Sequence, residues 1–318
     1  MGGLAAILTA LSILSASPVA GDSARVDCRY SSDEETTSAP TVEQSGGWNP
    51  IFLPQNDVFR PILADQREPR FYADYRRVHF RAESPLAEGN GNEINATLVA
   101  LGGEFGLWGL RQARGCDGLQ ISLFGAVFAQ FNLDTPSFDL LNADFLVGLA
   151  LTYRRGPWSG RLRTYHQSSH LGDKFLLNYG LAHGVAPQHP SFGVLDLLGS
   201  LEGKWWRLYG GGGLVVFSKE PDVSSTPLFV EYGFELRGAA WVWLGNSSLR
   251  PVFGAAFSDL QATGWSFNGS LEGGLEWASR TATHRVRALL VAQRGALLFS
   301  QFLFQKTQNA GVQLQFEF

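Results

Sequence analysis

Hydrophobic and polar residues alternate through most of this chain, and the alternation is especially clear from residue 142 to residue 171. In the first part of this stretch every second side chain is apolar; these residues are Ala143, Phe145, Val147, Leu149, Leu151 and Tyr153. Successive side chains of a β-strand point to opposite faces, so a period of two predicts a strand with one apolar and one polar face. After Arg155-Gly156-Pro157 a second run of this kind begins at Trp158, which predicts a hairpin.

The same alternation continues from residue 71 to the end of the chain. It predicts about twelve strands of about ten residues, the length that a tilted strand needs to cross a bilayer. The predicted strands are Phe71–Arg81, Ile94–Leu110, Leu119–Asn132, Ala143–Arg154, Trp158–Ser168, Gly193–Glu202, Trp205–Phe217, Leu228–Trp243, Leu249–Ser258, Trp265–Trp277, Arg285–Arg294 and Ala310–Phe318. No helical periodicity appears among them, so we expect an all-β, antiparallel fold.

The charged residues on the polar faces help to distinguish a membrane barrel from a soluble β-sandwich, which turns its apolar faces inward. Here the polar faces carry arginines and carboxylates in similar number and almost no lysine; they include Asp144, Arg154, Arg161, Arg163, Asp196, Glu202, Glu231, Glu235, Arg237, Arg250, Glu272, Glu276, Arg285 and Arg287. Arginine and carboxylate groups form bidentate pairs, which suits a lumen filled with ion pairs. Together with tryptophans at the strand ends, this pattern favours a transmembrane β-barrel without a wide pore.

Short and long connections alternate between the predicted strands, as in outer-membrane barrels, whose short turns are periplasmic. Residues 155–157 and 203–204 form short connections, whereas residues 169–192 and 295–308 form long ones. An even number of strands then returns both termini to the periplasm. The last strand alternates strictly up to Phe318 and resembles the C-terminal strand by which the barrel-assembly machinery recognises bacterial outer-membrane barrels.

The first 70 residues lack this alternation and divide into three segments. Residues 1–21 are apolar, are too short to span a bilayer and end in Val19-Ala20-Gly21, which predicts a secretory signal peptide. Residues 22–45 are rich in Ser, Thr, Asp and Glu, which predicts a disordered leader. Residues 46–70 contain four prolines, which disfavour a central strand or a helix. We therefore expect an ordered periplasmic strap leading into a barrel at residues 71–318.

Composition and charge narrow the function classes. The net charge of −4 gives no case for a nucleic-acid partner.

The two cysteines, Cys28 and Cys116, are too few for a disulfide scaffold or a structural zinc site. Cys28 lies in the leader and Cys116 in a turn on the predicted periplasmic side. Because that compartment is oxidising, we predict a Cys28–Cys116 disulfide that joins the leader to the barrel.

A histidine and a serine stand out on the apolar face of the second hairpin strand. His166 and Ser168 are two residues apart, so their side chains point the same way and their Cα atoms are about 6.5–7 Å apart. An imidazole at this spacing can reach a hydroxyl and act as its general base. Polar groups on a lipid-facing wall are poorly explained by solvation, whereas a lipid hydrolase needs them there. Ser169 has the opposite parity and is expected to face the lumen.

The His-Gln-Ser sequence at residues 166–168 resembles the His-x-Ser core of the outer-membrane phospholipase A family, a barrel of similar strand number with its active site on the outer wall. This resemblance implies an acyl hydrolase with Ser168 as nucleophile and His166 as general base. In that family a downstream asparagine orients the histidine. Asn178 is the match in this chain, and Asp173 is the alternative orienting residue.

A second resemblance covers more of the chain. Phe59–Phe71 together with His166–Asp173 is similar to an uncharacterised bacterial family, domain of unknown function 1207. It implies a protein of the cell envelope and no assigned activity.

The resemblance to the phospholipase family is incomplete, because that family has Asn-Gly where this chain has Ser-His at residues 169–170. A calcium cofactor is therefore implied only by the local His-x-Ser resemblance, no other cofactor is indicated, and a homodimer is left open.

Three interpretations of these residues stay open. In the first, His166 and Ser168 form the site of a lipid or ester hydrolase. In the second, both are polar side chains at the headgroup interface of a non-enzymatic barrel, which is a narrow channel, a transporter or a structural envelope protein among outer-membrane lipids. In the third, histidines and an acid bind a metal ion. The candidate ligands are His166, His170, Asp173, His183 and His189.

Overall fold

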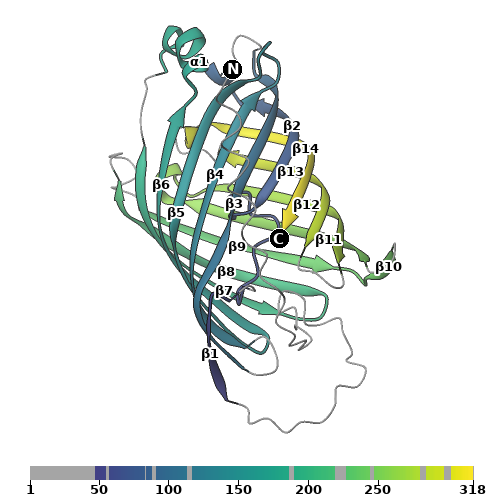
Figure 1. Ribbon diagram of the computed structural model, residues 1–318. Coiled ribbons are helices and arrows are strands. Elements are labelled where there is room, and N and C mark those ends of the chain that lie inside the picture. Colours follow the sequence, from purple (N-terminus) through teal and green to yellow (C-terminus); the bar gives the residue numbers. More distant parts are fainter. Residues whose placement is uncertain are drawn as a thin grey trace, which may run out of the picture.

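Twelve strands close into an antiparallel barrel, in which each pairs with its neighbours along the chain and β14 pairs with β2 (Figure 1). The computed structural model describes residues 47–54, 57–82, 84–87, 91–112, 117–185, 190–218, 227–243, 247–279, 284–296 and 302–317, and the count refers to these. The barrel strands are β2 (Phe71–Phe80), β3 (Glu93–Gln112), β4 (Gly118–Asn132), β5 (Asp139–Arg155), β6 (Trp158–Leu171), β7 (Ser191–Glu202), β8 (Trp206–Ser218), β9 (Leu228–Arg237), β11 (Ser247–Leu260), β12 (Ser266–Ser279), β13 (Arg285–Ala296) and β14 (Lys306–Glu317). The predicted all-β barrel is confirmed.

Two short strands lie outside this ring; they are β1 (Trp48–Phe52), which pairs with the end of β3, and β10 (Trp241–Trp243), which pairs with the start of β11. The prediction of a single strand over Leu228–Trp243 is wrong, because β9 ends at Arg237. The next residue, Gly238, donates its N–H to the Pro251 carbonyl, and a Cβ at position 238 would lie 2.4 Å from the Pro251 ring. Since proline has no N–H to donate, the regular ladder between β9 and β11 stops here.

The barrel has an apolar outer wall and a polar lumen, as the alternation predicts. Along β5, Leu149 is 47% exposed on the outside, whereas Asp144 and Thr152 are fully buried. Along β12, Leu271 is exposed and Glu272 is buried. Exposed tryptophans lie at or near strand ends; they are Trp158, Trp205, Trp206, Trp241, Trp265 and Trp277. This distribution is typical of a barrel whose outer face contacts lipid.

The two ends of the barrel differ in their connections. The turn end carries short connections such as residues 156–157 and 203–205, and the loop end carries longer ones such as residues 81–92 and 172–190. Figure 1 shows α1 at the loop end and β1 at the turn end. Within the described residues, no helix combines the length and apolar character needed to cross a membrane.

Short helical turns occur in the connections between the strands. They are η1 (Pro85–Ala87), α1 (Asp173–Phe175), η2 (Leu176–Gly180), η3 (Leu181–His183) and η4 (Gln261–Thr263). The α1 turn positions Phe175, whose buried ring packs in an apolar cluster with Leu86, Phe128 and Leu141 at the loop end. Burial of this one side chain gives the turn a tertiary contact that hydrophobic periodicity does not reveal.

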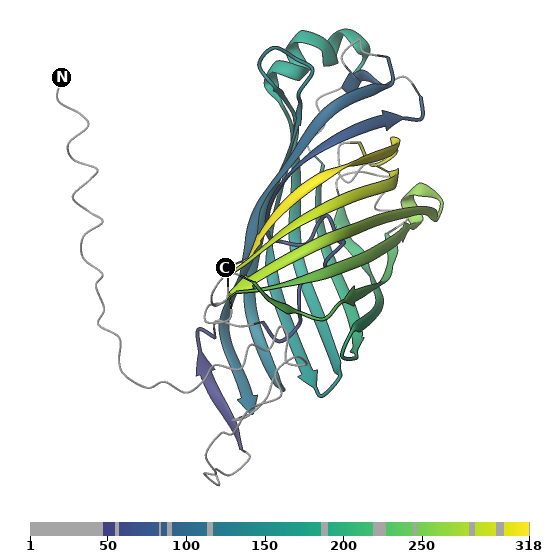
Figure 2. The same ribbon diagram turned by 90° about the vertical axis from the view of Figure 1, so that its right-hand side faces the viewer.

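The strap does not stay below the barrel, because residues 57–70 lie inside the lumen. Figure 2 shows this segment surrounded by strands. Arg154 Nε of β5 donates to the Val58 carbonyl at 2.9 Å, and the Leu63 N–H donates to Glu235 Oε1 of β9 at 2.8 Å. Phe59 is also fully buried within the barrel. The segment therefore has polar and apolar contacts with strands on different sides of the lumen.

Several predicted features lie outside the described residues. They are the signal peptide and leader up to residue 46, Cys28 and Cys116 with their predicted disulfide, His189, and the terminal Phe318.

Candidate functional site on the outer wall

His166 and Ser168 lie on the outer wall of the barrel. On β6, Arg161 is buried in the lumen, whereas Leu162 is 40% exposed on the outside, and both candidate residues share the parity of Leu162. Ser169 faces inward, where its hydroxyl hydrogen-bonds to a buried lumenal carboxylate. These orientations match the ones expected from the alternation.

His166 contacts a serine on the neighbouring strand. Its Nε2 lies 3.4 Å from the Ser191 hydroxyl of β7. Among the described residues, no hydrogen bond joins His166 to Ser168. In the antiparallel register Ser168 pairs with Ser191 and His166 pairs with Gly193, so all these side-chain positions share one patch of the outer wall. A contact of this length is common for a catalytic pair without substrate.

Phe217 of β8 supports the imidazole from the side. The two rings stack with centroids 5.8 Å apart and an angle of 20° between their planes. Gly193 makes this possible, because a Cβ at that position would lie 2.1 Å from the Phe217 ring. The pairing of β7 with β8 shifts between Gly193 and Val194, which brings Phe217 opposite the glycine. Three adjacent strands thus set the position of His166.

A shallow apolar groove runs along the outer wall beside this patch. Its volume is about 410 Å³, and it reaches both His166 and Ser168. Its other side chains come from β3, β4 and β5 and include Leu101, Val127, Phe145 and Val147. Phe145 and Val147 are 44% and 53% exposed, so the groove is open to the surroundings of the barrel. Its shape and chemistry suit a hydrocarbon chain.

The two candidate orienting residues are not part of this patch. Asp173 lies in α1 and Asn178 in η2, both exposed at the loop end. No hydrogen bond between described residues connects either of them to His166. The family resemblance suggested Asn178, with Asp173 as the alternative, but the chain turns into the helical segment after Leu171, and this takes both residues away from the strand.

The other described histidines do not gather with His166. His170 packs edge-on against Phe145 with centroids 5.8 Å apart, and His183 stacks on Tyr179 at 3.7 Å. The described part of the chain contains no group of three or more His, Cys, Asp or Glu side chains arranged to hold a metal ion. The metal interpretation therefore has no support from His166, His170, Asp173 or His183.

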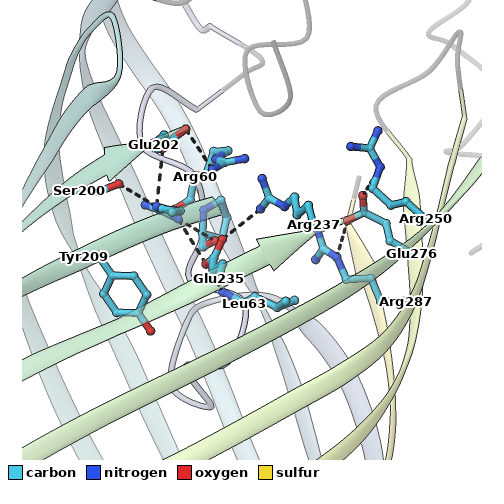
Figure 3. A network of polar contacts seen from close by, with 12 residues as sticks. Arg60, Leu63, Ser200, Glu202, Tyr209, Glu235, Arg237, Arg250, Glu276 and Arg287 are labelled. Carbon is cyan, nitrogen blue, oxygen red and sulfur yellow. Dashed lines mark hydrogen bonds and ion pairs between the residues drawn. The ribbon is translucent and has the colours of Figure 1, made fainter. Parts of the chain in front are cut away.

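The lumen contains a second set of charged residues, which binds the strap to the wall (Figure 3). Arg60 of the strap pairs with Glu202 at 3.0 Å, and Arg207 of β8 donates to the Arg60 carbonyl at 2.9 Å. Arg207 and Arg237 both contact Glu235, at 3.5 and 3.1 Å. Arg60, Arg207 and Glu235 are buried, so each of these charges depends on its partner to compensate for lost hydration.

Glu68 is the main carboxylate of the strap in this network. It forms a bidentate pair with Arg161, in which the longer contact is 3.1 Å, and lies 4.0 Å from Arg163. Burial by itself raises the pKa of Glu68, but the charges of Arg161 and Arg163 outweigh burial and lower the pKa to about 2. Glu68 is therefore ionised at neutral pH, as its pair with Arg161 requires.

Sequence reasoning missed Ser191 and the lumenal position of the strap. Ser191 has the parity of the outer wall on its strand, and this was the only available signal. Its proximity to His166 depends on the register across a long loop, which the sequence does not specify. For the strap, the signal was its unusual density of arginine and acidic residues between prolines, which resembles the composition of the polar barrel face.

Comparison with known proteins agrees with this architecture. No curated protein matches the chain. The outer membrane phospholipase A from Escherichia coli is similar in structure, with 16% identity, a TM-score of 0.52 and coverage of 80% of this chain and 92% of that chain. The Salmonella typhi outer membrane phospholipase dimer with bound calcium has 16% identity, a TM-score of 0.51 and coverage of 79% and 92%. At this identity the likeness shows the fold, an outer-membrane-type β-barrel. The family model of the proteins of unknown function DUF1207 matches residues 10–318, and the chain belongs to that family.

Proposed function

We propose that this protein is an outer-membrane acyl-ester hydrolase that acts on lipids at the outer wall of its barrel. The observation that carries the proposal is the 3.4 Å contact between His166 Nε2 and the Ser191 hydroxyl on a lipid-facing surface. Ser168 lies opposite Ser191 in the strand register, so two hydroxyl groups are close to one imidazole. The neighbouring apolar groove of about 410 Å³ provides a place for an acyl chain.

In this proposal His166 removes the proton of the serine hydroxyl as its oxygen attacks the ester carbonyl. The protonated imidazole then gives that proton to the departing alcohol, which leaves an acyl-serine. Water, activated by the same imidazole, releases the carboxylic acid and regenerates the serine. Ser191 is the hydroxyl in contact with the base, and Ser168 is the alternative nucleophile. The Phe217 stack limits rotation of the imidazole, which keeps Nε2 directed at the serine.

The proposal is tested with full-length protein in mixed micelles of detergent and phospholipid, with and without calcium, by measuring fatty-acid release. We expect hydrolysis by the wild type and a loss of about 10³-fold or more in His166→Ala. Ser191→Ala should lose a similar factor and Ser168→Ala a smaller one. Ser169→Ala is the matched control, because that serine lies on the same strand and faces the lumen.

A serine-directed acylating probe identifies the nucleophile independently of turnover. Labelling of Ser191 supports the assignment made above. Labelling of Ser168, with loss of activity in Ser168→Ala alone, keeps the hydrolase function and moves the nucleophile to the residue indicated by the His-x-Ser motif. If the folded wild-type protein releases no fatty acid under either calcium condition, the hydrolase proposal is wrong.

A non-enzymatic barrel is the second candidate function. The observation that favours it is the strap inside the lumen, where contacts such as Arg60–Glu202 attach it to the wall. A barrel filled in this way suits a structural envelope protein better than a wide pore. Conductance measurements in planar bilayers separate these cases, because a wide pore passes a steady current and a filled barrel does not.

Several further features are proposed for both candidate functions, the hydrolase and the non-enzymatic barrel. Outer-membrane lipids surround the wall, the barrel-assembly machinery recognises the last strand through Phe318, and both termini are periplasmic. A homodimer and a calcium cofactor are proposed by analogy with the Salmonella typhi phospholipase, which is a dimer with bound calcium. Residues 1–21 are proposed to be a cleaved signal peptide, followed by a disordered leader.

A further inference from the structure

A cavity inside the barrel lies on the opposite side of the sheet from His166. It has a volume of about 200 Å³ and is situated toward the loop end. Its walls are largely apolar and come from several strands and connections; they include Phe192, Val194, Val215, Phe229, Leu260 and Leu303. Phe192 and Val194 are buried, and Val215, Phe229 and Leu303 pack against them. None of these side chains contributes to the outer-wall site.

The floor of this cavity is polar and includes two carboxylates. Asp65 comes from the strap and Glu231 from β9. Both also line a second cavity of about 110 Å³, so the two spaces adjoin at this floor. Tyr165 of β6 lines the same cavity and adds a phenol hydroxyl to its polar groups. The strap therefore forms part of the site.

The polar side chains of this floor make few hydrogen bonds with the described part of the chain. Among the described residues, Glu231 has no hydrogen bond or ion pair, and the Tyr165 hydroxyl has no hydrogen bond. The Asp65 carboxylate accepts only the backbone N–H of Arg67, at 2.8 Å, from the described part of the chain. All three side chains are partly buried and line the cavity, so a ligand inside it can reach them.

The nearby cations are already engaged by other carboxylates. Arg163 pairs with Asp196 at 2.9 Å, and Arg67 pairs with Asp144 at 3.1 Å. Burial raises the pKa of Asp65, and Glu68 raises it further, although Arg163 and Arg70 oppose this. A raised pKa is expected for a carboxyl group whose surroundings supply too little positive charge. Because a nearby cation favours the ionised form of such a carboxyl group, the floor suits a cationic ligand better than an anionic one.

We infer that this lumenal cavity binds a small amphiphile with a primary ammonium head, whose alkyl chain lies between Phe192 and Phe229 and whose head contacts Glu231, Asp65 and Tyr165. An ammonium group has three N–H donors and no acceptor, which complements a floor made of acceptors. A volume of about 200 Å³ is many times the roughly 15 Å³ that one water molecule requires in a cavity, which leaves room for a short alkyl chain and its head. This binding site is independent of hydrolysis at the outer wall.

Hexylammonium is a suitable probe, with hexanol and hexanoate as ligands of equal chain length. Full-length protein in phosphatidylcholine nanodiscs is titrated by calorimetry, and empty nanodiscs provide the correction for partition into lipid. We expect hexylammonium to bind more tightly than either other ligand. Glu231→Gln and Asp65→Asn should each weaken hexylammonium by about tenfold, because each removes a charge-assisted hydrogen bond. Neither variant should change the affinity for hexanol.

Two further variants distinguish binding in this cavity from general effects of a substitution on the barrel. Asp259→Asn is the matched control, because Asp259 is an acidic residue whose partner, Tyr232, is exposed. It should leave binding unchanged. Ala262→Trp fills the cavity from its apolar wall and should abolish binding. Heat-dependent migration on a gel verifies that each variant is a folded barrel before its affinity is compared.

The inference is overturned by any of three results in folded protein. They are no saturable hexylammonium binding, equal or tighter binding of hexanol or hexanoate, or unchanged hexylammonium binding in Glu231→Gln, Asp65→Asn and Ala262→Trp. Loss of fatty-acid release in His166→Ala with unchanged hexylammonium binding would show that the two sites are separate.

Discussion

The imidazole of His166 illustrates how single residues acquire their roles in this barrel. The alternation along β6 determines that the ring points outward. Its neighbours come from other strands: the Ser191 hydroxyl from β7 and the Phe217 ring from β8. Gly193 lies between them in the register and provides the space for the Phe217 ring. One residue without a side chain therefore controls the stack on the candidate base.

Gly193→Ala tests this arrangement. The added methyl group would lie 2.1 Å from the Phe217 ring, so the ring must rotate away and lose its stack on His166. We expect the barrel to fold and the ring-current shift of the His166 protons in NMR spectra to disappear. Any fatty-acid release should fall by about tenfold or more, because catalytic groups tolerate little misplacement.

Gly199→Ala is the control for that substitution. Gly199 has the same parity on the same strand, and the nearest atom to an added Cβ is 3.8 Å away, an ordinary contact. It should change neither the His166 spectrum nor the activity. An unaltered His166 spectrum in Gly193→Ala would contradict the role assigned to the glycine.

In the lumen, Glu68 is a single residue whose contribution to stability can be tested. Glu68→Gln removes the charge that compensates Arg161 and Arg163, both of which are buried. Arg163 keeps Asp196 as its partner, whereas Arg161 loses the carboxylate that it pairs with, which should lower the free energy of unfolding by about 3 kcal/mol. The measurement is the denaturant midpoint in detergent. The control is Glu93→Gln, which breaks an exposed pair with Arg77. It should change the free energy of unfolding by less than about 1 kcal/mol.

The same carboxylate predicts a pH dependence. Its pKa of about 2 in the folded protein lies below its ordinary value of 4.5, so the unfolded chain takes up the proton first as the pH falls. The stability contributed by Glu68 is thus complete above pH 4.5 and is lost as the pH falls toward 2. We expect the stability difference between wild type and Glu68→Gln to be constant above about pH 5.5 and to narrow below it. A difference that widens toward low pH would contradict this.

At the scale of elements, the strap and the ends of the strands show what alternation leaves undetermined. Composition predicted an ordered, proline-containing segment, and the structure shows residues 57–70 within the barrel. The segment combines an apolar side, with Phe59 and Ile62 against Leu198, and a polar side that binds wall residues. The β9 strand ends early for a similar non-local reason, because Pro251 on the partner strand interrupts the ladder.

An engineered disulfide tests the position of the strap. A Cβ at position 254 of β11 would lie 3.2 Å from the Cβ of Ala64, close to the range of natural disulfides. In protein with Cys28 and Cys116 replaced by serine, we expect Ala64→Cys/Gly254→Cys to oxidise to an internal disulfide, detected by mass spectrometry. Ala64→Cys/Gly199→Cys is the control, because position 199 faces the outside. Free thiols in the first pair under oxidising conditions would contradict a lumenal strap.

At the scale of the whole molecule, an apolar wall encloses a polar interior, the reverse of a soluble domain. Buried charged residues such as Glu272 and Arg207 coexist with outward leucines such as Leu197, which is 61% exposed. This distribution is stable only where the outer wall meets lipid or detergent. It also explains why Arg–carboxylate pairs replace the apolar core of a soluble protein, since the lumen is the only place where these charges find partners.

The barrel should behave accordingly during purification. We expect unboiled protein in detergent to migrate differently from boiled protein on a gel, because the closed sheet resists detergent until it is heated. Removal of Phe318, a residue outside the described range, should reduce assembly into the outer membrane while leaving the synthesis of the chain unchanged. A mature chain that is soluble and monomeric without detergent would contradict the membrane assignment.

The predicted Cys28–Cys116 disulfide concerns the same compartment. If both residues are periplasmic, protein purified from the envelope should contain this bond, and peptide mapping without reduction should detect the linked pair. Protein isolated with reductant present provides the control, and two free thiols in the untreated sample would exclude the bond. The position of the leader relative to the barrel depends on this result.

The alternation of apolar and polar residues was enough to predict the fold class, the approximate strands and the face on which strand residues such as His166, Ser168 and Ser169 lie. This was possible because a period of two is a local property of the extended chain. Which residues contact one another became clear from the folded barrel. The pairing of Ser168 with Ser191 spans a loop, and the Leu63 contact with Glu235 joins residues 172 positions apart. Such contacts depend on register and on the filling of the lumen, and these result from the packing of the whole barrel.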